Sequence, residues 1–308
     1  MRKIFFCFIL VFIYSQSAFA QDKLEAILLV DRPLTPENYI IKVLDLALKN
    51  QEIPYNLKIE TIPASQPRRV QIVNSSSQNY VIALGSRKEH EEILKPIYVP
   101  IQLGLGIGHR IMLTRPDVED NLKKVKNLDD LSKFIFAQGL GWADVKILRN
   151  AGLTVHTPAD PTNIPKMLIR DRVDLYPRGL FEIAAEYKRY SADYPDLVID
   201  DYIVLSYPLA SFFYVRKDNE KLYNAIKTGL ETAYYNGQLQ DMIMTDPVYN
   251  KTMQEINLGK RIKIEIPIQN ISEKALSALK NFTFIPGKKI GEAVRKKRKD
   301  TPALQDDM

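Results

Sequence analysis

Cysteine is almost absent from this 308-residue chain, and its single cysteine, Cys7, lies within the first ten residues. If a signal peptide is removed, Cys7 leaves with it, so the mature chain has neither a disulfide nor a thiol nucleophile. Secreted eukaryotic domains of this size usually carry disulfides, whereas a large periplasmic domain is stabilised by its core. The scarcity of cysteine therefore favours a periplasmic protein.

Histidine is also scarce, and the common catalytic motifs are missing. The three histidines, His90, His109 and His156, are too scattered in the sequence for a metal-binding motif. The chain has no Gly-x-Ser-x-Gly turn and no Walker loop. We therefore expect no metal, no cofactor and no enzymatic activity.

A long hydrophobic run occurs only at the N-terminus. Arg2 and Lys3 precede an apolar stretch from Ile4 to Tyr14, and residues 18–20 (Ala-Phe-Ala) have the small-x-small pattern of a signal-peptidase site. The stretch is shorter than the about 20 apolar residues that span a membrane. We predict a cleaved signal peptide at residues 1–20 and a periplasmic location; a retained N-terminal anchor is the alternative.

Excess charge of one sign is confined to the two ends. Arg2 and Lys3 contribute +2 to the formal net charge of +6, and residues 285–308, with seven bases and four acids, contribute +3. The remaining body carries about +1, which does not resemble a nucleic-acid-binding surface. We expect the basic C-terminal tail, residues 285–308, to be solvated, with peripheral contact to anionic lipid as the alternative.

The body of the chain alternates β-rich runs with amphipathic helical patterns, which is typical of an α/β fold. Residues 24–30 read as a buried strand, residues 35–48 as a helix, and residues 56–62 as a second strand. A helix after Pro67 and a strand at 80–84 complete a compact first lobe.

A second series of strands and helices follows without a flexible linker. Residues 109–114 and 173–176 read as strands, and residues 142–151 as a helix. Two extended stretches, 98–104 and 203–215, flank this series and are the candidates for strands that cross between two lobes. The predicted domains are lobe one at 21–101 plus 209–284, an inserted lobe two at 102–208, and the tail at 285–308.

Several short segments, in this order and spacing, resemble a known family. They are Leu84–His90 ahead of Tyr98–Ile101, Gly139–Asp144 with Gly152, Arg172–Gly179, and Phe212–Val215. The chain resembles the extracellular solute-binding proteins of the polar amino-acid class over residues 24–245. The resemblance implies a two-lobed type II periplasmic-binding-protein fold with two crossover hinge strands. It also implies a monomer that presents a small ligand to an inner-membrane permease, as in an ABC transporter, or to a sensory receptor.

The chain departs from the family at both positions that hold a free amino acid. His90 stands where the family places the arginine that binds the α-carboxylate. The strand that ends near Tyr176 continues into residues 177–179 (Pro-Arg-Gly), where the family places an aspartate for the α-ammonium group. A buried zwitterion without these partners is unfavourable by several kcal/mol. The resemblance therefore carries over for the fold and not for an amino-acid ligand.

Basic and aromatic residues near the predicted strand ends are the candidate ligand contacts. Arg178 directly follows a buried strand, where open α/β sheets place ligands, with a salt bridge as the alternative role. Of Arg68 and Arg69 only one can face the cleft, and Arg68 fits the family pattern better. The predicted ligand-binding residues are Arg178, Arg68, Arg87, Ser86, Arg32, Gly141, Trp142, Tyr176 and Tyr207.

Gly141 and Trp142 each have a second interpretation. The turn at residues 139–141 either holds an anion at the start of the following helix or is an ordinary tight turn. Trp142, the only tryptophan, packs in the core or forms a wall of the ligand site. With the basic residues of the rim, these features predict an anionic or strongly hydrogen-bonding ligand.

Three hypotheses about function follow. The first is a periplasmic solute-binding protein that closes its cleft on a small polar ligand. The second is an adaptor or signalling partner that has lost small-molecule binding, suggested by the absence of both amino-acid anchors. The third is an enzyme on the same fold, which the lack of a nucleophile and base disfavours.

Overall fold

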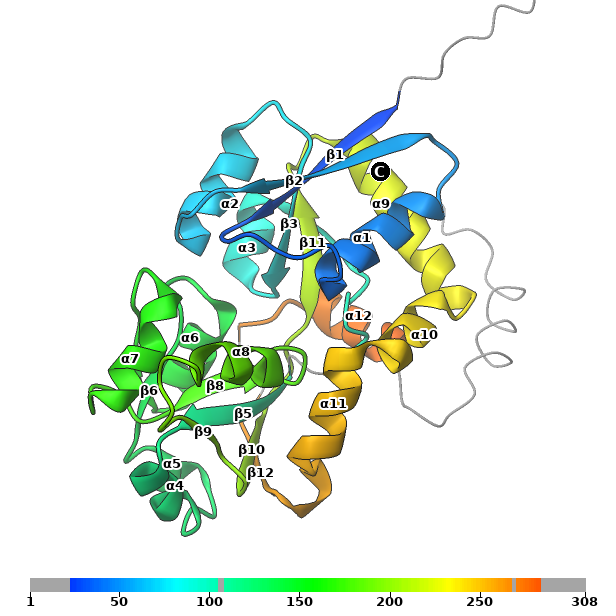
Figure 1. Ribbon diagram of the computed structural model, residues 1–308. Coiled ribbons are helices and arrows are strands. Elements are labelled where there is room, and N and C mark those ends of the chain that lie inside the picture. Colours follow the sequence, from blue (N-terminus) through cyan, green and yellow to red (C-terminus); the bar gives the residue numbers. More distant parts are fainter. Residues whose placement is uncertain (1–22, 105–107, 268–269, 284–308) are drawn as a thin grey trace, which may run out of the picture.

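Two separate β-sheets organise the residues that the computed structural model describes, which are 23–104, 108–267 and 270–283. Each sheet is the centre of one lobe, and helices cover both lobes (Figure 1). The predicted signal peptide and the predicted basic tail lie outside the described residues. No helix within the described ranges is long and apolar enough to cross a membrane.

The sheet of lobe one has the strand order β2-β1-β3-β11-β4. Strands β1 to β3 are parallel, and β11 runs antiparallel to both β3 and β4. Its strands are β1 (Leu24–Val30), β2 (Tyr55–Thr61), β3 (Tyr80–Gly85), β4 (Lys95–Ile97) and β11 (Ser211–Val215). Its helices are α1 (Tyr39–Lys49), α2 (Gln66–Ser75), α3 (Lys88–Ile93), α9 (Glu220–Tyr235), α10 (Gln238–Thr245) and α12 (Glu273–Phe282).

The core of lobe one follows from the apolar pattern of its elements. Helix α1 buries one stripe, and its first turn is capped by the Asn38 side chain, which accepts a hydrogen bond from the Ile40 N–H. The cap is therefore Asn38 and not Thr35, and the helix begins later than the sequence pattern suggests. Helix α9 lies so close to α1 that a Cβ on Gly229 would be 1.8 Å from the Ala47 carbonyl oxygen. Only glycine allows this approach.

The sheet of lobe two has the order β12-β10-β5-β8, and β9 also pairs with β5. Its strands are β5 (His109–Thr114), β8 (Tyr176–Gly179), β9 (Val198–Ile199), β10 (Ile203–Ser206) and β12 (Ile262–Glu265). A smaller sheet pairs β6 (Ile135–Ala137) with β7 (Thr154–His156). The helices are α4 (Pro116–Leu122), α5 (Leu128–Leu131), α6 (Ala143–Asn150), α7 (Ile164–Ile169) and α8 (Ile183–Tyr190), with short 3-10 turns at Pro161–Asn163 and Leu258–Lys260. Helix α11 (Pro247–Ile256) runs between the lobes, since Tyr249 packs in the core of lobe one and Ile256 in that of lobe two.

The chain crosses between the lobes at the two predicted stretches. It leaves lobe one after β4 and returns through residues 207–210, between β10 and β11. The two passages are hydrogen-bonded to each other, since Tyr207 N–H donates to the Gly108 carbonyl at 3.1 Å and Ile101 N–H donates to the Ser211 carbonyl at 2.9 Å. They form a paired hinge.

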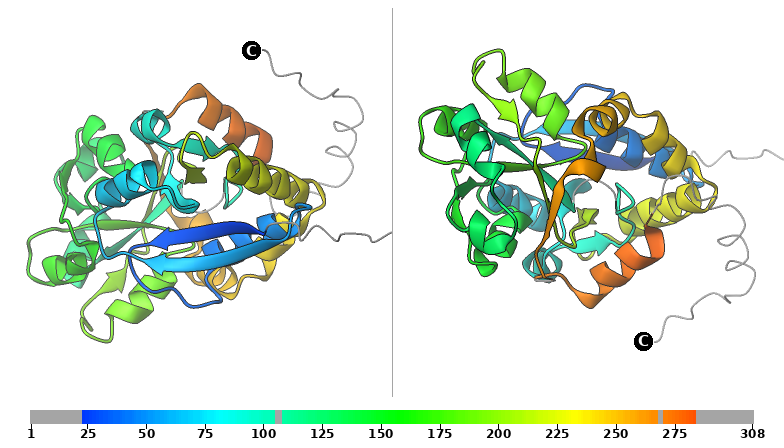
Figure 2. Two further views of the ribbon diagram at one scale, coloured as in Figure 1. Left: turned by 90° about the horizontal axis from the view of Figure 1, so that it is seen from above. Right: turned by 90° about the horizontal axis from the view of Figure 1, so that it is seen from below.

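The predicted domain boundaries are wrong at one place, because the C-terminal part of the chain also visits lobe two. Strand β12 pairs in parallel with β10, although residues 209–284 were assigned to lobe one. Buried Arg261 anchors this segment by donating to the Ile256 carbonyl at 2.7 Å and by pairing with Asp200. The segment then returns, and α12 packs against lobe one, which the two views of Figure 2 show in orange. The lobes are therefore joined by more than the two predicted crossings.

Candidate functional site

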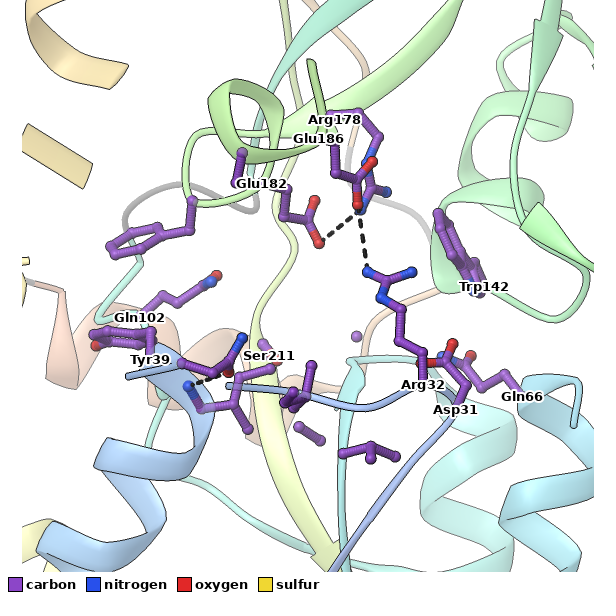
Figure 3. A pocket seen from close by; sticks show the side chains of 18 of the residues that line it. Asp31, Arg32, Tyr39, Gln66, Gln102, Trp142, Arg178, Glu182, Glu186 and Ser211 are labelled. Atoms are coloured by element: carbon purple, nitrogen blue, oxygen red, sulfur yellow. Dashed lines mark hydrogen bonds and ion pairs between the residues drawn. The ribbon is translucent and has the colours of Figure 1, made fainter. Parts of the chain in front are cut away.

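A cleft of about 300 Å³ lies between the lobes and is lined by residues from both (Figure 3). Lobe one contributes the end of β1, the starts of α1 and α2, Gln102 and Ser211. Lobe two contributes residues of β5, the start of α6, the end of β8 and α8. Because the hinge joins the two walls, a change in lobe orientation changes the shape of this cleft.

Nine charged side chains line the cleft. Eight of them, which we call the cleft charges, are Asp31, Arg32, Arg69, Arg110, Asp144, Arg178, Glu182 and Glu186. A ninth charged lining residue, Arg189, is exposed, and its guanidinium group lies 5.0 Å from the centre of the Tyr190 ring. The cleft charges are four arginines and four carboxylates.

Arg178 is the centre of a buried ion network in lobe two. Its guanidinium group forks onto Glu186, with Nε–Oε2 and Nη2–Oε1 distances of 2.8 and 2.9 Å, and Nη2 lies 3.0 Å from Glu182 Oε1. Arg178 is only 3% exposed. Its position in β8, paired with Ile111 of β5, places it in the sheet and not in a loop. The described polar contacts of Arg178 are salt bridges, which is the alternative role that the sequence analysis considered for it.

Glu182 is the carboxylate of this network that is most open to the cleft, with 36% of its side chain exposed. It accepts a hydrogen bond from the Gly179 N–H at 2.9 Å and lies 3.3 Å from Arg110 Nη1. Burial alone would raise the pKa of Glu182, but the Arg178 and Arg110 guanidinium groups outweigh it and hold the pKa below its ordinary value. Glu182 is therefore ionised at neutral pH.

A second ion pair lies beside the first and involves a predicted residue. Arg110 Nη2 is 2.5 Å from Asp144 Oδ1, and both side chains are almost fully buried. The Tyr207 hydroxyl donates to Asp144 and accepts from Arg110 Nε at 3.1 Å. Tyr207 does not line the cleft, so it contacts the site only through this pair.

Aromatic rings cover the network and close one side of the cleft. The Arg178 guanidinium carbon lies 4.8 Å from the centre of the Trp142 ring and 5.0 Å from that of Tyr176. Trp142 is thus both a lining residue and packed against the lobe-two core, which combines the two roles considered for it. Phe181 lies between Tyr39 of α1 and Tyr249 of α11, with ring centres 4.9 and 4.7 Å away.

Lobe one offers mainly uncharged polar groups to the cleft. The side-chain oxygens of Gln66 and Gln102 are buried and have no hydrogen-bond partner. The Tyr39 hydroxyl donates to the Ile101 carbonyl at 2.6 Å, and Asn38 caps α1. Figure 3 places Gln66 beside Arg32 and Gln102 beside Tyr39, so the two amides lie toward different sides of the cleft.

Direct contacts between the lobes hold the cleft closed. Arg32 Nη2 lies 3.5 Å from Glu186 Oε1, and Arg87 Nη1 donates to the Gly141 carbonyl at 2.8 Å. Lys146 Nζ lies 2.6 Å from Glu89 Oε1. Burial alone would raise the pKa of Glu89, but hydrogen bonds from Lys146, its own backbone and Arg87 lower it to about 2, so this pair stays charged.

The nine residues predicted from the sequence fall into four groups. Arg178, Arg32 and Trp142 line the cleft, whereas Arg87 and Gly141 meet at the neighbouring lobe contact. Ser86, Tyr176 and Tyr207 are buried behind the walls; the Ser86 hydroxyl accepts from the Ala210 N–H. The ninth, Arg68, is exposed.

Arg69, not Arg68, faces the cleft. Helix α2 begins at Gln66, and this helical phase buries Arg69, which lies 3.4 Å from Asp31 and donates to the Ala64 carbonyl. The position where the helix starts decides which of two adjacent arginines points inward.

Most of the other lining residues were not predicted, among them Gln66, Gln102, Arg110, Asp144, Glu182 and Glu186. Arg110 gave one usable signal, since it is a charged residue inside a short apolar strand. Among the described residues no group of three or more histidine, cysteine or acidic side chains is arranged to hold a metal ion.

Known proteins resemble this chain in shape but not closely in sequence. No family model and no curated protein matches it. An amino acid ABC transporter substrate-binding protein from Streptococcus pneumoniae, bound to L-arginine, is 14% identical; the match covers 75% of this chain and 95% of that one, with a TM-score of 0.53. The VFT2 domain of Bordetella pertussis BvgS is 16% identical, with coverages of 72% and 93% and a TM-score of 0.56. A Salmonella typhimurium periplasmic binding protein with high arginine specificity is 14% identical, with coverages of 76% and 99% and a TM-score of 0.51.

At these identities the similarity establishes the fold. The chain has an α/β fold of two lobes, each with a mixed sheet, and it matches the type II periplasmic-binding proteins. The fold predicted from the sequence is confirmed. The arginine named for two of the matched proteins is a ligand of those proteins.

Proposed function

We propose that this chain is a periplasmic solute-binding protein that closes its two lobes around one small polar ligand. The observation that supports the proposal is the cleft itself, which lies beside a paired hinge and takes polar groups from both walls. A ligand that touches both walls binds the closed form better than the open form and shifts the equilibrium toward closure.

The cleft suits binding better than catalysis. The described residues that line it include no histidine and no cysteine, and its carboxylates are held by arginines. A general acid or base needs a proton that can be exchanged near neutral pH, whereas the ion pairing of Glu182 lowers its pKa and keeps it ionised. We therefore propose a receptor without enzymatic activity.

The partner in the membrane is the second part of the proposal. Relatives by fold include a substrate-binding protein of an ABC transporter and a BvgS domain. We propose that the closed form of this chain docks on an inner-membrane permease or a sensory receptor after export by the predicted signal peptide.

A ligand screen on the purified mature chain tests the proposal. Thermal unfolding is measured with sugars, polyols, amides, amino acids, carboxylates and phosphate, because a ligand that binds only the folded state raises the unfolding temperature by mass action. The expected result is at least one class of compound that raises it, without turnover of that compound. A uniformly negative screen would favour the ligand-independent adaptor, and turnover would favour an enzyme.

A further inference from the structure

The eight cleft charges have no charge left to offer to a ligand, and Arg189, which is exposed, is the one charged lining residue outside their pairs. Each of the eight cleft charges lies within 3.5 Å of a cleft charge of opposite sign, and the four arginines balance the four carboxylates. Arg32 is the most exposed of the arginines in these pairs, with 34% of its side chain exposed, and it already contacts Glu186. A ligand that places a charge among the cleft charges would therefore have to separate an existing pair, which leaves a buried charge without a partner.

Two of the polar groups that are left to offer are amides. The Gln66 and Gln102 side-chain oxygens are both buried in the cleft wall and have no partner among the described residues. A buried acceptor without a donor is unfavourable, so these oxygens favour any ligand that brings an N–H or O–H group to them. Rotation of the amide by 180° would present the N–H₂ group instead, so the same side chains can also meet an acceptor.

We infer that the cleft selects a small ligand without net charge, whose N–H or O–H groups donate to Gln66 and Gln102. This inference rests on the proposed function and names its ligand class. It departs from the anionic ligand expected from the arginines in the sequence, because Arg178 and Arg110 are committed to buried carboxylates. It also explains why the wall of lobe one carries amides beside its single internal pair, Arg69 with Asp31. The volume of about 300 Å³ is at the lower end for small-ligand sites.

The direct test compares compounds of similar shape and different charge. Calorimetric titration of the mature chain uses uncharged compounds (ribose, xylitol, uracil), zwitterions (serine, glutamine), anions (glutamate, phosphate) and cations (lysine, putrescine). We expect binding only from the uncharged set, because each end of a zwitterion would also have to separate an existing pair. A zwitterion that binds more tightly than every uncharged compound would overturn the inference. An anion or cation that binds tenfold more tightly than every neutral compound would overturn the inference and leave the solute-binding function intact. Absence of binding in all four sets would instead contradict the proposed function.

Two variants test the amides with the compound that binds best. Gln66→Leu and Gln102→Leu should each weaken binding at least tenfold, because the ligand loses its acceptor. Gln71→Leu is the matched control, since Gln71 is exposed on the same helix α2 as Gln66, and its affinity should not change. Unchanged affinity in both cleft variants would overturn the assignment of the amides.

A charge variant tests the balance independently of the amides. Arg32→Gln removes the most exposed positive cleft charge and leaves the cleft charges with one carboxylate in excess. The variant should bind cations at least tenfold better relative to neutral compounds than the unmodified chain does. Lys49→Gln, an exposed substitution on α1 outside the cleft, is the control. An unchanged preference in Arg32→Gln would show that the balance does not set selectivity.

Discussion

The two walls of the cleft use different chemistry. The wall of lobe two carries three carboxylates and two arginines that are tied to one another, to the Gly179 backbone and to Tyr207. The wall of lobe one carries one internal ion pair, Arg69 with Asp31, and Arg32, which pairs across the cleft with Glu186. Its other polar groups are uncharged, and two of them are unpaired.

The difference assigns structural support to the wall of lobe two and ligand recognition to the wall of lobe one. A network in which every member has a partner fixes the wall of lobe two before any ligand arrives, whereas unpaired amides in lobe one are completed only by a ligand. We therefore expect substitutions in the lobe-two network to change folding first and substitutions in lobe one to change binding first. The following predictions test this contrast, beginning with the largest effect.

Arg178→Ala should lower the free energy of unfolding by about 3–5 kcal/mol. The substitution leaves Glu182 and Glu186 without their shared guanidinium group in a buried site, and removing one partner of a buried pair costs about this much. The measurement is urea unfolding followed by circular dichroism at neutral pH. A loss below about 1 kcal/mol, the range typical of an exposed ion pair, would show that the network does not support the wall of lobe two.

Arg172→Ala is the matched control for this experiment. Arg172 lies in the same lobe, six residues earlier, and is exposed. Its substitution should change the free energy of unfolding by no more than about 0.5 kcal/mol, as for most surface positions. A similar loss in both variants would mean that the Arg178 effect is not specific to the buried network.

Gly141→Ala should hinder closure of the lobes. A Cβ on Gly141 would lie 2.5 Å from two ring carbons of Pro67 in the other lobe, and Gly141 has a φ of +81°. Overpacking of this kind costs about 1–3 kcal/mol, and only the closed form bears it. The variant should bind ligand at least tenfold more weakly and show a larger radius of gyration by X-ray scattering.

Gly152→Ala separates the inter-lobe clash from backbone strain. Gly152 has nearly the same φ, +82°, but a Cβ there would meet nothing within 4 Å. Both variants should lose about 1 kcal/mol of folding free energy from the left-handed backbone, while only Gly141→Ala changes affinity and dimensions. Equal affinities in the two variants would place Gly141 outside the closing contact.

The sequence contained enough information for the fold and for part of the cleft. Apolar runs such as residues 24–30 predict buried strands, and the extended stretches at 98–104 and 203–215 indicate the crossings, because strand periodicity is a local property. Strand β12 was missed since four residues with two isoleucines are too short to show a pattern, and its pairing with β10 joins positions about 60 residues apart. Arg178 was visible at its strand end.

The chemistry of the site was harder to predict because it depends on pairing. The sequence shows the arginines, but not that Glu186, eight residues after Arg178, returns to neutralise it. Nor does it show that Arg110 and Asp144 meet inside lobe two. Arg68 and Arg69 differ only by the phase of α2, which is set at Ser65 and Gln66. The sequence predicts an anionic ligand because it shows the arginines and does not show which carboxylates neutralise them.

His90 provides the smallest test of the contrast, since lobe one buries this ionisable group in its neutral form. Burial lowers the pKa of His90 to about 4, helped by Arg87 and opposed by Glu89 and by the Gly85 carbonyl, 3.1 Å from Nδ1. The unfolded chain binds this proton near pH 6.5, so its contribution to stability is present above pH 6.5 and is lost as the pH falls toward 4.

Acidification to pH 5.5 should lower the free energy of unfolding by about 1.4 kcal/mol from this group. His90→Gln should remove that part of the pH dependence in urea unfolding at pH 7.5 and 5.5, with His156→Gln, an exposed site, as control. Equal pH dependence in the unmodified chain and His90→Gln would contradict a neutral buried histidine.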